Sequence, residues 1–103
     1  MSRMREMKEF DGAIKIYEDV LALRKELEPN KKIEQAVCMS SMAGAYREIS
    51  RYDQAETYLK SALDIFMKEL GEYHLNTATC FNNIAMNYKR QKKYSKAEEY
   101  YLR

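Results

Sequence analysis

The 103-residue chain has little proline and glycine and no tryptophan. With one Pro and three Gly, it has few residues that end helices or favour tight turns, so few and long elements are expected. Ala, Leu, Met, Glu and Lys are abundant, and these residue types favour helix. The length allows at most one small domain. The composition therefore predicts a small all-α protein.

The sequence also lacks a long apolar run. No segment approaches the roughly 18 consecutive apolar residues that cross a bilayer. Residues 1–8, Met-Ser-Arg-Met-Arg-Glu-Met-Lys, have no apolar centre of the kind that a signal peptide needs. We therefore expect no membrane partner and a cytoplasmic location.

A strong charge of one sign is missing too. The chain has 18 basic and 16 acidic residues, well mixed, with a net charge of +2. Nucleic-acid binding usually needs a strong basic patch, so no nucleic acid is expected as a partner. The densest basic segment, residues 89–93, is interpreted as a solvated helix end where cations oppose the helix dipole. Binding of an acidic partner is the alternative.

Cysteine and histidine are scarce. Cys38 and Cys80 hold the same place in two successive copies of an internal repeat. Equivalent positions of packed helices lie roughly 8–10 Å apart, too far for a disulfide, which needs Cα atoms within about 7 Å. Both are predicted to be buried thiols in a reducing compartment. His74, the single histidine, has no second ligand nearby, so a hydrogen bond within its link is expected in place of a metal site.

Motifs of catalysis are absent from the sequence. It has no glycine-rich phosphate loop, no nucleophile elbow and no Cys/His pair. The acidic residues, such as Glu98 and Glu99, are interpreted as exposed helix carboxylates, not as an acid/base pair. We therefore expect no enzyme activity and no cofactor.

The most informative feature of the chain is its internal repeat, whose period of about 42 residues lies in the range of stacked helical repeats. Residues 10–17, 52–59 and 94–101 each begin with an aromatic residue that is followed three positions later by Ala. A second set of matches precedes each of the last two copies. Its members are Ala36, Cys38, Ala43 and Tyr46 in one copy and Ala78, Cys80, Ala85 and Tyr88 in the next. Small residues at fixed points let paired helices approach closely, and such pairs must stack to bury their apolar faces.

Apolar spacing near 3.6 residues predicts five helical segments in antiparallel pairs, with both terminal segments incomplete. Residues 2–9 are expected to be the last turns of a helix whose earlier part is missing. The predicted helices span about 10–27, 33–50, 53–70, 76–91 and 95 to the end at residue 103. Their expected end signals are Asp11 and Asp53 as N-caps, Pro29 as a stop, and Gly71 at a left-handed terminus.

The repeat resembles the tetratricopeptide repeat. The resemblance covers nearly the whole chain, and its residues are Met39, Met42, Ala43, Tyr46, Ala55, Leu59 and Ala62, then Phe81, Ile84, Ala85, Tyr88, Ala97 and Tyr101. Val20 departs from the usual Ala. The ordinary repeat of the family has a period of about 34 residues. The longer period of this chain resembles the kinesin light chain type, although Leu75 stands where that type commonly has Pro.

The resemblance implies a right-handed solenoid of antiparallel helix pairs with about 2.5 repeats. It divides the single array, 1–103, into a partial repeat over 1–32, a full repeat over 33–74 and a truncated repeat over 75–103. In such a solenoid the first helix of each pair lines a concave groove. The groove positions here are Val37, Ser40, Ser41, Gly44 and Arg47 in one repeat and Thr79, Asn82, Asn83, Met86, Lys89 and Arg90 in the next.

Six of these positions are predicted to bind a peptide. Asn82 and Asn83 have amides that donate and accept, as a peptide backbone requires. The cations could pair with acidic side chains or a terminal carboxylate, and the flexible thioether could fit varied partners. The predicted set is Arg47, Asn82, Asn83, Met86, Lys89 and Arg90. Ser40 and Gly44 replace residues that a clamp for chaperone tails would need, so no such clamp is predicted. A solvated polar helix face is the alternative.

Three functions are compatible with these residues. The first is a scaffold that binds a peptide or protein segment in the concave groove. The second is a structural segment of a longer regulatory protein whose partner contacts lie elsewhere. The third is a sensor domain attached to an effector module. The incomplete ends also predict self-association through apolar faces that one repeat cannot cover.

Overall fold

The computed structural model describes residues 3–101 of the chain, and side chains from residue 9 to residue 100. These residues form helices joined by short links, without a strand among them. The helices are α1 (Arg3–Leu27), α2 (Lys32–Glu48), α3 (Tyr52–Leu70), α4 (Leu75–Arg90) and α5 (Tyr94–Tyr101). The predicted all-α class, with helices that pack in sequence, is thereby confirmed.

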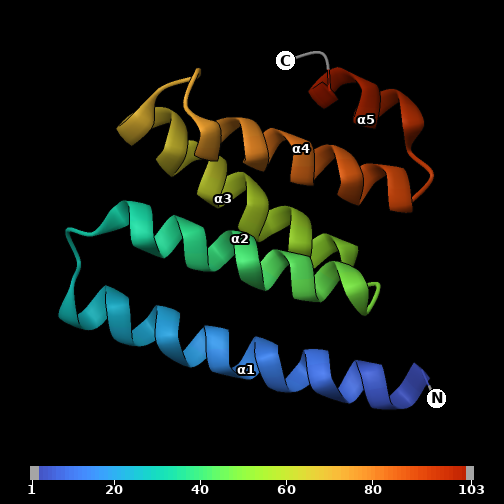
Figure 1. Cartoon of the computed structure of the whole chain (residues 1–103), viewed down its shortest axis with the longest axis horizontal. Coiled ribbons are helices and arrows are strands. Elements are labelled where there is room, and N and C mark those ends of the chain that lie inside the picture. Colours follow the sequence, from blue (N-terminus) through green and yellow to red (C-terminus); the bar gives the residue numbers. More distant parts are fainter. Residues whose placement is uncertain (1–2, 102–103) are drawn as a thin grey trace.

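Each helix packs against the next one in the chain, and α2 also contacts α4 (Figure 1). The fold is a slab of 41 × 38 × 18 Å. Short links between long helices force neighbours to run antiparallel. Because α2 touches α1, α3 and α4, it occupies the middle of the stack, and the links alternate between the two ends of the slab (Figure 1).

The core lies between α2, α3 and α4, and the alanines of the repeat are at its closest contacts. Ala43, Ala55, Ala62 and Ala85 are all 0% exposed. A residue with a single methyl group lets two helix backbones approach, and the larger apolar side chains fill the remaining space. Those larger buried side chains are Met42, Leu59, Phe66, Ile84 and Tyr88.

The turn after α2 recurs after α4. Ser50 and Lys92, at equivalent positions of successive repeats, both have φ of 63°. In both turns the next N–H reaches back to a tyrosine carbonyl, from Arg51 to Tyr46 and from Lys93 to Tyr88, each at 2.9 Å. A left-handed residue other than Gly costs about 1–2 kcal/mol, and the closed turn offsets part of that cost. The internal repeat is therefore present in the backbone conformation as well as in the side chains.

The sequence-based prediction for the N-terminal segment is wrong. A helix end near residue 9 and an N-cap at Asp11 were expected, but α1 is continuous from Arg3 to Leu27 and Asp11 lies inside it. Residues 3–9 consist of Arg, Met, Glu and Lys, which favour helix. A break would leave backbone N–H and C=O groups without helical partners, so the continuous helix is favoured.

The other predicted helix-end signals are Asp53, Gly71 and Pro29, and the first of these predictions is wrong. Asp53 is not the cap of α3, because α3 begins at Tyr52 after Arg51, whose side chain makes no capping bond. Asp53 still places its charge in the first turn, where the helix dipole favours it. Gly71 ends α3 with φ of 85°, and its N–H bonds to two carbonyls of the last turn. Pro29 lies in the link after α1, as predicted.

Candidate peptide-binding groove

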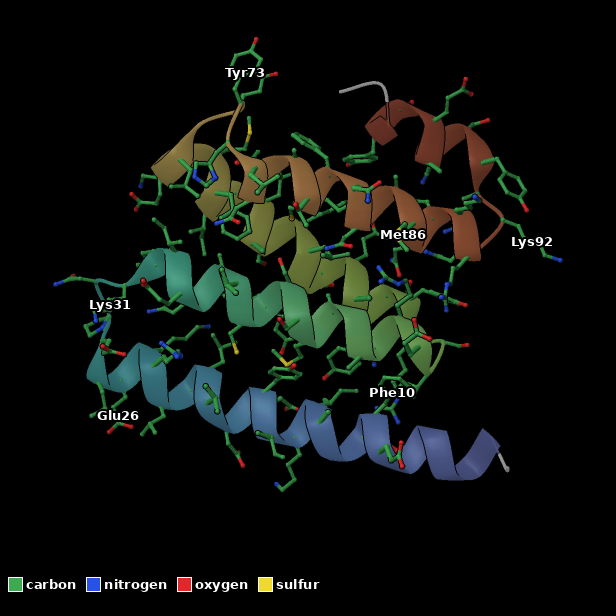
Figure 2. The ribbon with its side chains drawn as sticks, in the orientation of Figure 1. Phe10, Glu26, Lys31, Tyr73, Met86 and Lys92 are labelled. Atoms are coloured by element: carbon green, nitrogen blue, oxygen red, sulfur yellow. The ribbon has the colours of Figure 1, made fainter. Side chains whose placement is uncertain are left out.

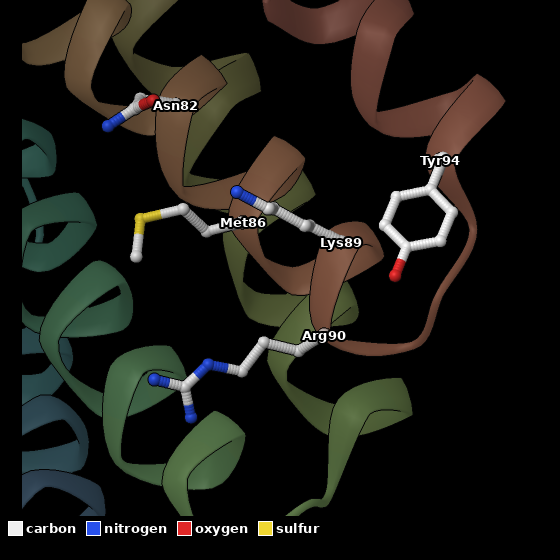
Figure 3. Close-up of a pocket in the computed structure, with 5 residues that line it drawn as sticks. All are labelled: Asn82, Met86, Lys89, Arg90 and Tyr94. Carbon is white, nitrogen blue, oxygen red and sulfur yellow. The ribbon is translucent and has the colours of Figure 1, made fainter.

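The side chains of one face of α4 surround a hollow of about 520 Å³ (Figure 3). Its lining residues are Asn82, Met86, Lys89, Arg90 and Tyr94. The first four have helical spacing, so a regular helix places them on one side. Tyr94 comes from the start of α5, which returns beside α4 after the turn at Lys92 (Figure 2). Four of the six predicted residues are thus brought together.

The lining of this hollow is partly open to solvent. Asn82 and Lys89 are exposed, Met86 is half-buried, and Tyr94 is 59% exposed. Figure 3 shows the Met86 thioether directed away from Tyr94 and toward the side of α2. Lys89 forms no ion pair with another of the described residues. The site therefore offers an amide, a thioether, a free ammonium and a phenol to a ligand.

Tyr94 was missed as a groove residue by the sequence analysis. It opens the third copy of the repeated segment, and the equivalent Tyr52 is half-buried. In the structure the ring of Tyr94 stands at the edge of the hollow (Figure 3). The pattern of an aromatic residue after a tight turn was visible in the sequence, but its orientation was not.

A second, smaller hollow of about 250 Å³ lies between α2 and α4. Phe66 of α3 contributes to it, together with hydroxyl and amide side chains. Its lining residues are Val37, Ser40, Ser41, Phe66, Asn76, Thr79 and Asn83. Adjacent residues of a helix point in different directions, so Asn82 and Asn83 line different hollows. The structure therefore separates two residues that the sequence analysis treated as a pair.

Arg47 connects α2 to α4. Its Nη1 donates to the backbone carbonyl of Asn83 at 3.4 Å, while its Nε is buried without a partner among the described residues. Burial, and then the charge of Arg90, lower the pKa of the Arg47 guanidinium. This side chain is half-buried and lines neither of the two hollows described above. Its contacts are those of a residue that holds two helices together.

Arg90 forms a two-point ion pair across the same junction. Its Nη2 lies 3.2 Å from Oε1 of Glu48, and its Nη1 donates to Oε2 at 3.3 Å. Glu48 is the last residue of α2, and Arg90 is the last residue of α4. They occupy equivalent positions in successive repeats. Parallel stacking of α2 and α4 brings equivalent ends side by side, and this explains the pair.

Buried polar residues fix the links that support the groove. Gln35 and Thr77, at equivalent positions of successive repeats, each bond to a carbonyl of the preceding link, that of Glu28 at 3.1 Å and that of Gly71 at 2.8 Å. Asn87, 1% exposed, donates from Nδ2 to the carbonyl of Tyr52 at 3.1 Å. Asn87 was missed because Ala45 occupies the equivalent position. A buried amide is retained where it satisfies a backbone group.

The thiols lie in the core, as predicted. Cys38 and Cys80 are free and buried, and each S–H is directed at a carbonyl of the preceding helix, those of Tyr17 at 3.5 Å and Leu59 at 3.2 Å. Burial raises the pKa of Cys80 to about 11. The two cysteines therefore act as small apolar residues with a weak donor.

His74 makes the local hydrogen bond that the sequence analysis expected. Its Nδ1 accepts from the backbone N–H of Asn76 at 3.1 Å, which makes it the N-cap of α4. No group of three His, Cys, Asp or Glu side chains is placed to hold a metal within the described residues. Among the helices that the structure describes, none is long and apolar enough to cross a membrane.

Comparison with known proteins gives the class of this chain. The Tetratricopeptide repeat family model matches residues 4–68 and again residues 35–103, so the chain belongs to the tetratricopeptide repeat family. Domains of this family generally mediate protein interactions and are typically non-catalytic. A search of curated proteins found no match.

A solved structure narrows the type of repeat. The chain resembles BtubC (BKLC) from P. vanneervenii, a kinesin light chain-like tetratricopeptide protein, with a TM-score of 0.78 and 30% identity. The match covers 91% of this chain and 37% of BtubC, so the chain spans about a third of that protein. The predicted kinesin light chain-like type is thus confirmed.

Proposed function

We propose that the concave groove of α2 and α4 binds an extended peptide segment of a protein partner. The observation that carries this proposal is the hollow of about 520 Å³ at the end of α4. Ligand pockets typically have volumes of about 300–1,000 Å³ with a few well-placed polar groups. Asn82, Lys89 and Tyr94 are such groups, and Met86 adds an adaptable apolar surface.

Each lining residue has a role in this proposal. The Asn82 amide pairs with the backbone of the peptide, since it can donate and accept at once. Lys89 attracts a carboxylate of the peptide, because it has no ion-pair partner among the described residues. Met86 offers an apolar contact on the side of α2, and Tyr94 offers a second one at the opposite edge of the hollow. Arg47 and Asn83 fix the separation of α2 and α4, through the bond between them.

The proposal also includes the boundaries of the repeats. We take residues 1–32 as the second part of one repeat, 33–74 as a complete repeat and 75–103 as the first part of another. The groove is then formed by the first helices of two successive repeats, α2 and α4. The contact between these helices supports this division.

A randomised octapeptide array tests the proposal. The chain is expected to select a consensus peptide, and Asn82→Ala with Met86→Ala should weaken its binding about ten- to a hundredfold, because backbone pairing and apolar contact are both lost. Fluorescence polarisation of the labelled consensus peptide measures the loss. Asn30→Ala, in the link between α1 and α2, is the matched control. Unchanged affinity in the double variant, or no selected peptide, would refute the groove as the binding site.

Self-association is a second proposal, supported by an apolar stripe on α1. Ile16, Leu23 and Leu27 are 64%, 54% and 67% exposed. Together with Val20 they are spaced four, three and four residues apart. Apolar residues with this spacing form the seam between paired helices. We propose that this stripe, made of Ile16, Val20, Leu23 and Leu27, pairs with a second copy of the chain at high concentration.

A further inference from the structure

The ends of α2 and α4 hold more positive than negative charge. Arg47, Lys89 and Arg90 lie in the last turns of these helices, where the helix dipole favours cations. Among the ion pairs of the described residues, Glu48 is the one carboxylate that pairs with any of the three. A ligand with a negative charge would therefore be attracted to this junction.

Glu48 and Arg90 are paired at a solvent-exposed site. Their side chains are 36% and 44% exposed. An exposed ion pair contributes about 0.2–1 kcal/mol, because water and salt screen it and two long side chains must be ordered. Such a pair can open at little cost. Arg90 meanwhile lines the hollow beside Lys89, so its guanidinium can serve either Glu48 or a ligand.

The neighbouring Arg47 makes the junction favourable for a further carboxylate. Its Nε is buried without a partner among residues 9–100, and its one hydrogen bond is to the carbonyl of Asn83. The charge of Arg90, added to burial, lowers the pKa of Arg47. The guanidinium groups of Arg47 and Arg90 thus repel each other, and among the described residues Glu48 is the one carboxylate that pairs with either of them. A second carboxylate at Arg90 would reduce this repulsion.

We propose that Glu48 is an internal competitor for an acidic side chain of the bound peptide, and that Arg90 and Lys89 accept this side chain when Glu48 moves away. The inference rests on the proposed peptide groove and adds the chemistry of its ligand. Glu48 would then lower the affinity for the acidic peptide and leave the affinity for a neutral peptide unchanged, since a neutral peptide gains nothing from the Arg90 charge. The groove would favour peptides with Asp or Glu at one defined position.

Glu48→Gln is the decisive change. It removes the competing charge and keeps the shape of the side chain. The acidic peptide selected on the octapeptide array should bind about two- to fivefold more tightly, which is the cost of opening an exposed ion pair. A version of that peptide with Gln at the acidic position should bind Glu48→Gln and the unchanged chain equally well. Fluorescence polarisation at low and high salt measures both.

Two controls separate competition from general charge effects. Glu72→Gln changes the net charge equally in the link between α3 and α4, at the opposite end of α4 from Arg90 (Figure 1), and should leave both affinities unchanged. Arg90→Gln should weaken the acidic peptide, and adding Glu48→Gln to it should have no further effect. Such a double-mutant cycle isolates the coupling of the two residues.

The possible outcomes are distinct. Weaker binding of the acidic peptide to Glu48→Gln would show that Glu48 positions Arg90, and would overturn competition. Equal binding, or a consensus peptide without an acidic residue, would overturn the inference while leaving the peptide groove intact. No selected peptide at all would overturn both. Tighter binding by Glu48→Gln, confined to the acidic peptide, would support the proposal.

Discussion

Helices α1 and α3 hold equivalent positions of the repeat but have different surroundings. Val20 of α1 is 37% exposed, whereas its equivalent in α3, Ala62, is 0% exposed. Ile16 is 64% exposed, whereas its equivalent Tyr58 stacks on Tyr46 of α2 with ring centroids 5.8 Å apart. The packing partners explain the difference, because α3 lies between α2 and α4, while α1 contacts α2 alone.

This comparison shows that exposure depends on neighbours as much as on residue type. The stripe on α1 is more apolar than the corresponding face of α3, since Val20 replaces Ala62 and Leu27 replaces Glu69. Apolar side chains gain about 25 cal/mol per Å² when they leave water. The apolar stripe of α1 therefore favours a covering helix, and this is the basis for the proposed self-association.

The largest expected effect on the free energy of unfolding comes from substituting two leucines that differ in burial. Leu59 of α3 is 0% exposed and Leu23 of α1 is 54% exposed. Leu59→Ala should lower the free energy of unfolding by about 2–5 kcal/mol, because it leaves a cavity in the core. Leu23→Ala should change it by about 0.5 kcal/mol or less. Urea denaturation at low protein concentration measures both. Equal losses would contradict the claim that α1 is uncovered.

A smaller effect on the free energy of unfolding is expected at high pH from the thiols of Cys38 and Cys80, which hold equivalent positions. Burial raises the pKa of Cys80 to about 11, whereas an unfolded thiol has a pKa of about 8.5. The unfolded state therefore loses its proton first, and the stability that Cys80 contributes is present below about pH 8.5 and is lost as pH rises to about 11. The loss attributable to this group is up to roughly 3 kcal/mol.

Cys80→Ala isolates this contribution. The difference in free energy of unfolding between the unchanged chain and the variant should shrink as pH rises from about 8 to about 11, because the variant lacks the thiol. Cys38→Ala should show a weaker pH dependence, since Cys38 is 8% exposed and Cys80 is 1% exposed. Urea titrations at several pH values test this. Parallel pH curves for Cys80→Ala and the unchanged chain would exclude a buried neutral thiol at this site.

The smallest expected effect on folding comes from the stripe of α1. Leu27→Glu gives α1 the residue that α3 has at the equivalent position, Glu69. Because Leu27 is 67% exposed, the free energy of unfolding should change by about 0.5 kcal/mol or less. Self-association should nevertheless weaken about tenfold, since a charge then lies in the proposed seam. Sedimentation velocity over a range of concentrations measures it.

Ser61→Glu, on an exposed position of α3, is the matched control for charge. It should leave the self-association constant unchanged. A chain that sediments as a monomer at every concentration would refute the proposed pairing. Equal weakening by both variants would show that net charge, not the stripe, controls association.

Much of the fold was readable from the repeat. The matches between successive copies predicted the pairs of helices, the buried alanines and the equivalent burial of Cys38 and Cys80. These features were predictable because they depend on the spacing of residues along one helix, or because the same residue types surround equivalent positions in both repeats. The continuity of α1 was not predicted, because the repeat was expected to begin a new helix at residue 10, as it does at residues 52 and 94. Residues 3–9 are Arg, Met, Glu and Lys, which favour a continuous helix.

The groove was less predictable. Helical spacing placed Asn82, Met86, Lys89 and Arg90 on one side of α4, and the structure shows them around one hollow. The ion pair of Arg90 with Glu48 depends on the distance between two helices, which no residue pattern states. The role of Tyr94 at the edge of the hollow depends on the direction in which α5 leaves the turn.

The sequence by itself determined the helices, their pairing and the family, because the hydrophobic period and the small residues recur at a fixed interval. The tertiary structure decided which equivalent residues differ in function. The stacking of α2 on α4 brought Glu48 within 3.2 Å of Arg90, while the position of α1 at the end of the stack left Ile16 and Leu27 exposed. Local periodicity encodes the elements, but electrostatics and burial depend on which elements are neighbours.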